Sequence, residues 1–215
     1  MSTSHLHRVF WAVCPPEACI QRTARLVEQL RGPVQKLGLT VAWVRPDSLH
    51  ITLKFLGDCT SEQLSRMVEP LAQLVQGRPQ LTAPLVVLGL AAFPSLERPR
   101  VLFATVTETV QATQLPLELA QLQAELDRAL VGLGHRADDH RFHPHLTLGR
   151  VKDATPDRTG TRPKALLELA ERVCPLPLSE PFVPPSLILF ESQQTEHGTR
   201  YLPLHTLPLS PTETR

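Results

Sequence analysis

Two copies of one four-residue pattern carry the residue types that acid–base chemistry needs. His50–Leu53 (HITL) and His145–Leu148 (HLTL) both read histidine, apolar, threonine, apolar. Side chains two positions apart in a strand point to the same face, so each copy would present an imidazole and a hydroxyl together. Imidazole titrates near neutral pH, so one ring can accept a proton while the other donates one. Two such rings in one cavity would suit cleavage of a phosphodiester.

The segments around the two patterns predict elements that could bring them together. We expect the first motif strand to run from His50 to about Leu56 and the second from Phe142 to about Val151. Each half of the chain offers an early strand, a helix, a His-Thr strand and a second helix. This order predicts a duplicated α+β unit with two lobes that face each other.

Local signals place the helix ends and the tails. We expect a helix from Glu17 to about Leu30, ended by Gly32-Pro33. Thr60 and Gln63 have the spacing of a capping box, so a second helix should begin there. Pro70 should kink or break this helix. Residues 1–7 and 210–215 are predicted to be loose tails of a single domain spanning 1–215.

The composition limits the partners and the compartment. The 215 residues include 22 basic and 21 acidic side chains, for a net charge of +1, so no global field would attract nucleic acid. Any nucleic-acid contact should then be local, such as a strand end held in a cleft. The four cysteines form no C-x-x-C pair, which is typical of a reducing cytoplasm. The apolar run Val9–Cys14 is too short for a signal peptide or a membrane span.

The residues around the two patterns resemble a known family. Arg45–Gly57 (RPDSLHITLKFLG) and His143–Arg150 (HPHLTLGR) are similar to the two signatures of the two-histidine (2H) phosphoesterases. Within that superfamily, the RNA 2′,3′-cyclic phosphodiesterases of bacteria and archaea, also called 2′-5′ RNA ligases, are the most similar branch. The opening Arg8–Val13, the Phe93-Pro94 loop and the closing Leu187–Ser192 resemble it too, so the likeness covers about residues 8–209.

The resemblance implies a fold, an activity and roles for particular residues. It implies an α+β fold of two pseudo-symmetric lobes, with two mainly antiparallel sheets flanking a central cleft and helices on the outside. It implies hydrolysis of a terminal 2′,3′-cyclic phosphate on RNA or a nucleotide to a 2′-phosphomonoester, with a possible reverse 2′-5′ ligation. His50 would be the proton donor and His145 the acceptor, with no metal and no cofactor. Separately from the resemblance, the cysteine usage leads us to expect a cytoplasmic protein, and nothing in the sequence demands more than a monomer.

Three further side chains are candidates for holding the phosphate. The hydroxyls of Thr52 and Thr147 share a face with the histidines and could donate to nonbridging oxygens. Arg150 matches a phosphate-binding arginine of the family, and a guanidinium suits that task. Strict alternation from His145 would put Arg150 on the wrong face, unless a bulge at Gly149 re-aims it. Lys54 falls on the His50 face, where we expect a solvated lysine.

Alternative functions remain open on the sequence. His140, His143 and His145 are three histidines within a short segment, so a zinc site is conceivable, although Pro144 and the strand parity oppose it. A non-catalytic binder of RNA ends, or a related phosphodiesterase acting on a small cyclic nucleotide, would fit the same fold. Trp43 and Tyr201 could stack on a base, but aromatic residues near strands more often belong to the core.

Overall fold

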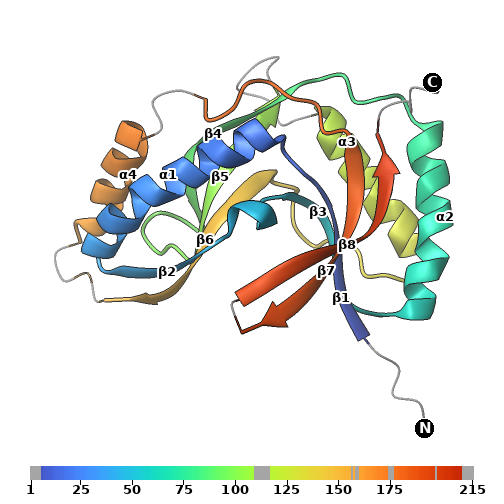
Figure 1. The fold of residues 1–215 in the computed structure, drawn as a ribbon, viewed down its shortest axis with the longest axis horizontal. Coiled ribbons are helices and arrows are strands. Elements are labelled where there is room, and N and C mark those ends of the chain that lie inside the picture. The colour runs from blue at the N-terminus through green and yellow to red at the C-terminus, as the bar shows by residue number, and fades with distance from the viewer. Residues whose placement is uncertain are drawn as a thin grey trace, which may run out of the picture.

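The computed structural model describes residues 6–108, 117–155, 157, 160–173, 177–196 and 198–209. Within these residues the chain forms two four-stranded antiparallel sheets and four α-helices (Figure 1). The α+β fold with two antiparallel sheets is thereby confirmed. Leu6 and His7, expected in a loose tail, are the first residues of a strand, and the His7 ring lies 2.7 Å from a Glu191 carboxylate oxygen.

Each sheet contains one of the two motif strands. The first sheet has the order β3-β1-β7-β8, formed by β3 (Ile51–Thr60), β1 (Leu6–Val13), β7 (Ser186–Thr195) and β8 (Gly198–Pro208). The second sheet has the order β2-β6-β5-β4, formed by β2 (Leu39–Trp43), β6 (His145–Ala154), β5 (Val101–Glu108) and β4 (Leu85–Phe93). A motif strand, its antiparallel neighbour and a third strand recur in both sheets, as β3-β1-β7 and as β6-β5-β4.

The two halves of the chain exchange helices between the sheets. The helices are α1 (Glu17–Lys36), α2 (Ser61–Gly77), α3 (Leu117–Gly132) and α4 (Arg162–Val173). α1 follows β1 of the first sheet but packs on β2 and α4 beside the second sheet. α3 follows β5 of the second sheet but packs on β3 and α2 beside the first. The first lobe is therefore the first sheet with α2 and α3, and the second lobe is the second sheet with α1 and α4.

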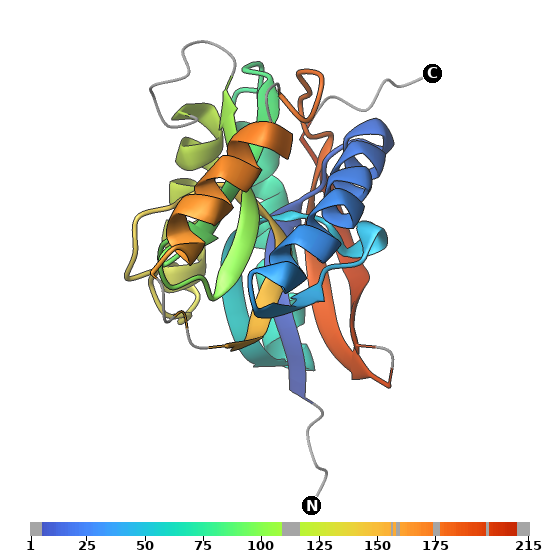
Figure 2. The ribbon, with the colours of Figure 1, turned by 90° about the vertical axis from the view of Figure 1, so that its left-hand side faces the viewer.

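The helices lie on the outer sides of the two sheets, with α1 and α4 at one end of the molecule and α2 and α3 at the other (Figures 1 and 2). The buried side chains of both lobes form one continuous hydrophobic cluster, which includes Trp11, Leu53, Leu126 and Leu148. The exchange of helices explains this shared core, because each half of the chain buries apolar surface in both lobes. The two lobes therefore stabilise each other, and the motif strands β3 and β6 are held in fixed positions relative to each other.

Two helices continue through residues that we expected to end or break them. α1 runs past Gly32-Pro33 to Lys36, because Leu30 and Val34 on either side are both fully buried in the core. α2 begins with the predicted capping box of Thr60 and Gln63. It then runs unbroken through Pro70 to Gly77. In both helices the burial of apolar residues beyond the proline offsets the missing backbone hydrogen bond.

Candidate active site

The fold brings the two predicted histidines to one place. His50 precedes β3 and His145 begins β6, and these two motif strands contact each other across the two lobes. The charges of His145 and Arg150 both act on the His50 ring, and the charge of Arg150 also acts on the His145 ring. His50, His145 and Arg150, from distant parts of the chain, thus meet at one site between the sheets.

Both imidazoles are oriented by the same hydrogen bond. Nδ1 of His50 lies 2.8 Å from the Ser48 carbonyl oxygen, and Nδ1 of His145 lies 2.7 Å from the His143 carbonyl oxygen. A carbonyl can only accept, so each Nδ1 carries the proton that it donates. In the neutral ring, Nε2 is then the basic nitrogen. The carbonyl two residues upstream therefore prepares Nε2 of each ring to accept or to deliver a proton.

Aromatic side chains hold each ring from the sides. Phe10 lies 4.7 Å from His50 between ring centroids, and Tyr201 contacts the same ring edge-on at 4.9 Å. Phe93 and Phe103 lie 5.1 and 5.2 Å from His145, also in edge-on contact. These contacts restrict rotation of the imidazoles and remove water from part of their surface. The positions of Nε2 are therefore fixed before any ligand binds.

The two threonines lie beside the histidines on their strands. Thr52 and Thr147 are half-buried, and each stands between two buried aliphatic neighbours that point to the core. Within the described part of the chain neither hydroxyl has a hydrogen-bond partner. Both hydroxyls are therefore available to a ligand on the histidine face.

A bulge turns Arg150 towards the cleft. β5 pairs Phe103 with Thr147 and Leu102 with Gly149, which leaves Leu148 without a partner. Leu148 and Gly149 are consequently both buried, and Arg150 becomes exposed on the same side as His145. The bulge that the sequence required for a phosphate-binding Arg150 is present in the structure, one position earlier than Gly149.

Gly149 allows the neighbouring strand to approach closely. A Cβ atom at this position would lie 2.5 Å from Cγ1 of Val41 and 3.2 Å from the carbonyl oxygen of Ala42, both on β2. Only a residue without a side chain permits this packing. The close approach keeps β2 paired to β6 immediately beside Arg150.

The first motif strand has a bulge at the matching position. β1 pairs Ala12 with Thr52 and Trp11 with Lys54, so Leu53 has no partner. Leu53 and Lys54 both point into the protein, and the exposed position that corresponds to Arg150 is Phe55, whose exposed fraction is 48%. Our expectation of a solvated Lys54 is therefore wrong, because its side chain is only 1% exposed.

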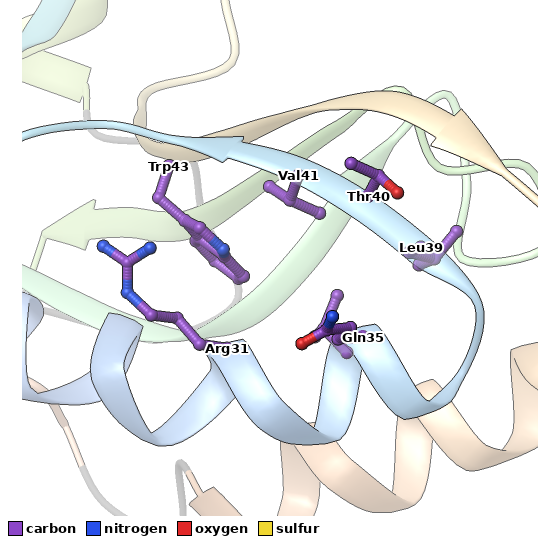
Figure 3. Close-up of a pocket in the computed structure, with 7 residues that line it drawn as sticks. Arg31, Gln35, Leu39, Thr40, Val41 and Trp43 are labelled. Atoms are coloured by element: carbon purple, nitrogen blue, oxygen red, sulfur yellow. The ribbon is translucent and has the colours of Figure 1, made fainter.

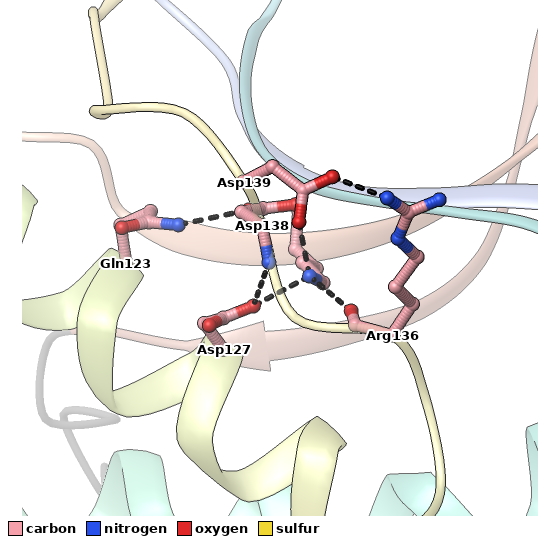
Figure 4. Close-up of polar contacts among 6 residues, drawn as sticks. Gln123, Asp127, Arg136, Asp138 and Asp139 are labelled. Carbon is pink, nitrogen blue, oxygen red and sulfur yellow. Dashed lines mark hydrogen bonds and ion pairs between the residues drawn. The ribbon is translucent and has the colours of Figure 1, made fainter.

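Lys54 joins the first motif strand to the segment that leads to the second. Figure 4 shows the carboxylates of Asp127 and Asp138 and the neighbouring Arg136 that surround its ammonium group. Its Nζ donates to Oδ1 of Asp127 on α3 at 2.5 Å, to Oδ1 of Asp138 at 2.9 Å and to the Arg136 carbonyl at 2.7 Å. Burial by itself would lower the pKa of Lys54, but the bonds and charges of the two aspartates outweigh it and raise that pKa. The charged ammonium thus holds the approach to His145 in place with all three of its protons.

Both catalytic candidates are weak bases in the unliganded protein. Burial, followed by the charges of His145 and Arg150, lowers the pKa of His50 to about 4, against the opposing hydrogen bond to the Ser48 carbonyl. Burial also lowers the pKa of His145, together with the charges of His143 and Arg150. Near neutral pH both rings are therefore neutral until an anion restores a proton to one of them.

A pocket of about 350 Å³ opens beside this centre, between the end of β2 with β6 and the β7–β8 hairpin. We call it the basic pocket, and its lining includes Arg45, Arg150, Lys152, Gln194, Thr199 and Tyr201. Tyr201 also contacts the His50 ring, and the backbone carbonyl of Ser48 that orients His50 belongs to another lining residue. The pocket therefore lies next to His50, and Arg150, whose charge acts on both histidine rings, lines it.

Trp43 lines the edge of the basic pocket and also packs against the core. Its side chain points towards α1, where the Arg31 guanidinium lies 5.8 Å from the ring centroid (Figure 3). A separate pocket of about 260 Å³ lies there between α1 and β2. The packing of Trp43 against the hydrophobic core confirms the core role, whereas Tyr201 is the aromatic residue that faces the catalytic centre.

The zinc alternative finds no ligand set among the described residues, in which no three His, Cys, Asp or Glu side chains are grouped to hold a metal ion. The His143 ring instead lies edge-on to Phe93 and Phe103 at 5.3 and 5.6 Å. Sequence reasoning missed the burial of Lys54 and the positions of Lys152 and Arg45 in the lining of the basic pocket, because both depend on tertiary contacts. Proximity to the signatures was the signal that could have suggested them.

Comparisons with known proteins agree with this geometry. A model of the LigT-like phosphoesterases matches residues 13–103 and 110–180. An RNA 2′,3′-cyclic phosphodiesterase from Archaeoglobus fulgidus is 32% identical over 150 residues, 70% of this chain and 76% of that protein. One from Aeropyrum pernix is 31% identical over 126 residues, 59% of this chain and 66% of that protein. The crystal structure of TT0787 from Thermus thermophilus superposes with a TM-score of 0.65 at 26% identity, covering 94% of this chain and 97% of that one. The chain belongs to the family of LigT-like phosphoesterases.

Proposed function

We propose that this protein hydrolyses the terminal 2′,3′-cyclic phosphate of RNA to a 2′-phosphomonoester, using His50 and His145 as an acid–base pair. The observation that carries the proposal is the identical orientation of the two imidazoles beside one arginine. The similarity to the RNA 2′,3′-cyclic phosphodiesterases of Archaeoglobus fulgidus and Aeropyrum pernix supports the substrate class. Turnover distinguishes this function from that of a non-catalytic binder of RNA ends.

The reaction needs one proton removed and one supplied. Nε2 of His145 takes a proton from water, whose oxygen attacks phosphorus as the bond from phosphorus to O3′ breaks. Nε2 of His50 delivers its proton to the departing O3′, which leaves the phosphate on O2′. When a 5′-hydroxyl takes the place of water, His145 removes the proton of that hydroxyl and His50 again protonates O3′. The product is then a 2′-5′ phosphodiester, which accounts for a ligase activity.

Thr52, Thr147 and Arg150 stabilise the charge that builds on the phosphate. The two hydroxyls donate to the nonbridging oxygens from the same strand faces as the histidines. The Arg150 guanidinium balances the anion and favours its binding. These groups are in place before the substrate binds, so little reorganisation is needed as the charge develops.

The pH dependence should reveal the lowered pKa values. We expect both limbs of the kcat/KM profile to lie below the ordinary imidazole value of about 6.5, because burial lowers the pKa of both rings in the free enzyme. The two limbs belong to the pair rather than to either ring. Bound phosphate favours the imidazolium, so the kcat profile should be shifted to higher pH. Initial rates on adenosine 2′,3′-cyclic phosphate measure both profiles, and a flat kcat/KM between about pH 5 and 9 would contradict the pair.

Product analysis tests the proposed function directly. Incubation with an oligonucleotide that ends in a 2′,3′-cyclic phosphate should yield a 2′-phosphate end, identified by chromatography against 2′- and 3′-phosphate standards. A 3′-phosphate product would show that the other P–O bond breaks and would overturn the assignment of the leaving oxygen. Binding without any product would favour the non-catalytic binder.

The site of action and the assembly belong to the same proposal. We infer a cytoplasmic, monomeric enzyme that forms one domain, with each lobe supplying one histidine. Cys14, Cys19 and Cys59 are free thiols, which supports a reducing compartment. None of the described helices is both long and apolar enough to cross a membrane.

A further inference from the structure

The basic pocket carries more positive charge than a single cyclic phosphate requires. Arg150, Lys152 and Arg45 all line it, and no carboxylate side chain is part of its lining. Among the described residues neither Arg150 nor Lys152 has an ion-pair partner. Arg45 pairs with Asp47 at 2.7 Å, but both side chains are about half exposed and this contact is easily exchanged. Lys152 is thus a charged side chain in this pocket that has no role in the proposed hydrolysis.

The position of Lys152 relates it to Arg150 and through it to the reacting phosphate. The two residues are two positions apart on β6, both are exposed, and both line the same pocket. Two positions along a strand correspond to about 6.6 Å. Successive phosphates of a nucleic-acid strand are separated by a comparable distance. If Arg150 contacts the cyclic phosphate, Lys152 therefore lies at about the distance at which the preceding phosphate of the same strand is expected.

The remaining lining suits the nucleoside that connects two phosphates. Tyr201 supplies an aromatic ring beside His50, and Gln194 and Thr199 supply an amide and a hydroxyl from the β7–β8 hairpin. Thr199 Oγ1 and Gln194 Oε1 lie 3.3 Å apart on the exposed side, where both are accessible to a ribose or a base edge. A volume of about 350 Å³ accommodates one nucleotide.

We propose that the basic pocket holds the terminal nucleotide, and that Lys152, assisted by Arg45, binds the phosphodiester on its 5′ side. This inference rests on the proposed hydrolysis and names its substrate class. The enzyme acts on cyclic ends of oligonucleotides in preference to free nucleoside 2′,3′-cyclic phosphates. The preference comes from one electrostatic contact, so it is expressed in KM and weakens as the salt concentration rises.

Two dinucleotides that differ by one charge test the contact. The first is an adenosine dinucleotide with an ordinary phosphodiester and a 2′,3′-cyclic phosphate end. The second is its methylphosphonate analogue, in which the internal linkage is neutral. We expect the KM of the charged dinucleotide to be about tenfold lower, the effect of one hydrogen bond to a charged group, with kcat unchanged. Lys152→Gln should abolish this difference.

Lys164→Gln is the matched control, because Lys164 lies on α4 with its side chain 82% exposed beside Glu168. It removes the same charge and should leave the tenfold preference intact. Equal KM values for both dinucleotides in the unmodified enzyme, or a tenfold preference that survives Lys152→Gln, would overturn the inference while hydrolysis stands. Adenosine 2′,3′-cyclic phosphate is assayed alongside. If neither it nor the dinucleotides are hydrolysed, the proposed function itself fails and the inference fails with it.

Discussion

Replacement of His50 or His145 by alanine is expected to lower kcat by about 10²- to 10⁴-fold, the range for loss of a positioned acid or base. Each ring is oriented by its bond to a backbone carbonyl and held among aromatic side chains, so no neighbouring group can take over its Nε2. The double variant should lose much less than the product of the two single losses, because the rings act as a unit. Initial rates on a cyclic-phosphate-ended oligonucleotide measure all three variants.

His143→Ala is the matched control for these variants. His143 lies two residues before His145 and contacts the same two phenylalanine rings, but it contributes only its backbone carbonyl to the orientation of His145. Alanine preserves that carbonyl, so kcat should change by less than about tenfold, well under the range expected for an acid or a base. A loss in His143→Ala as large as that in His145→Ala would contradict our assignment of the pair.

Lys54→Met should destabilise the protein by about 3 kcal/mol, at the low end of the range for breaking a buried ion pair. The variant keeps the length of the side chain but leaves Asp127, Asp138 and the Arg136 carbonyl without their shared donor. The low end applies because the carboxylates are 20% and 37% exposed and can be hydrated again. Urea denaturation measures the free energy of unfolding, and Lys164→Met on the surface should lie within about 0.5 kcal/mol of the unmodified protein.

The same Lys54 variant should also impair catalysis in the folded enzyme. Lys54 connects β3, which follows His50, to the segment that leads into His145, so its loss should shift the two rings relative to each other. We expect a lower kcat at temperatures where circular dichroism shows a folded protein. Adding Asp127→Asn and Asp138→Asn removes the uncompensated charges and should restore part of the stability. A stability loss below about 1 kcal/mol, the mean for point variants, would contradict the structural role of the network.

Several local expectations from the sequence agree with the structure because their physics involves only nearby residues. The capping box of Thr60 and Gln63 forms as its spacing predicts. The alternation of His50, Thr52 and their aliphatic neighbours holds up to Leu53. The helix end expected at Gly32-Pro33 was wrong, because contacts of Val34 with the core decide where α1 stops. Burial in a tertiary core overrides the local preference of proline.

From the sequence alone we could predict that each histidine shares a strand face with a threonine, that the two motifs resemble the family signatures, and that the fold is α+β. Strand periodicity and residue chemistry suffice for these predictions. Only the tertiary structure decided which way the side chains of Lys54 and Arg150 point, since the bulges at Leu53 and Leu148 arise from pairing with β1 and β5. It also decided that α1 and α3 pack on the lobe opposite their preceding strands. These pairings join residues that are far apart in the chain. The free energy that they contribute therefore cannot be predicted from the pattern of neighbouring residues.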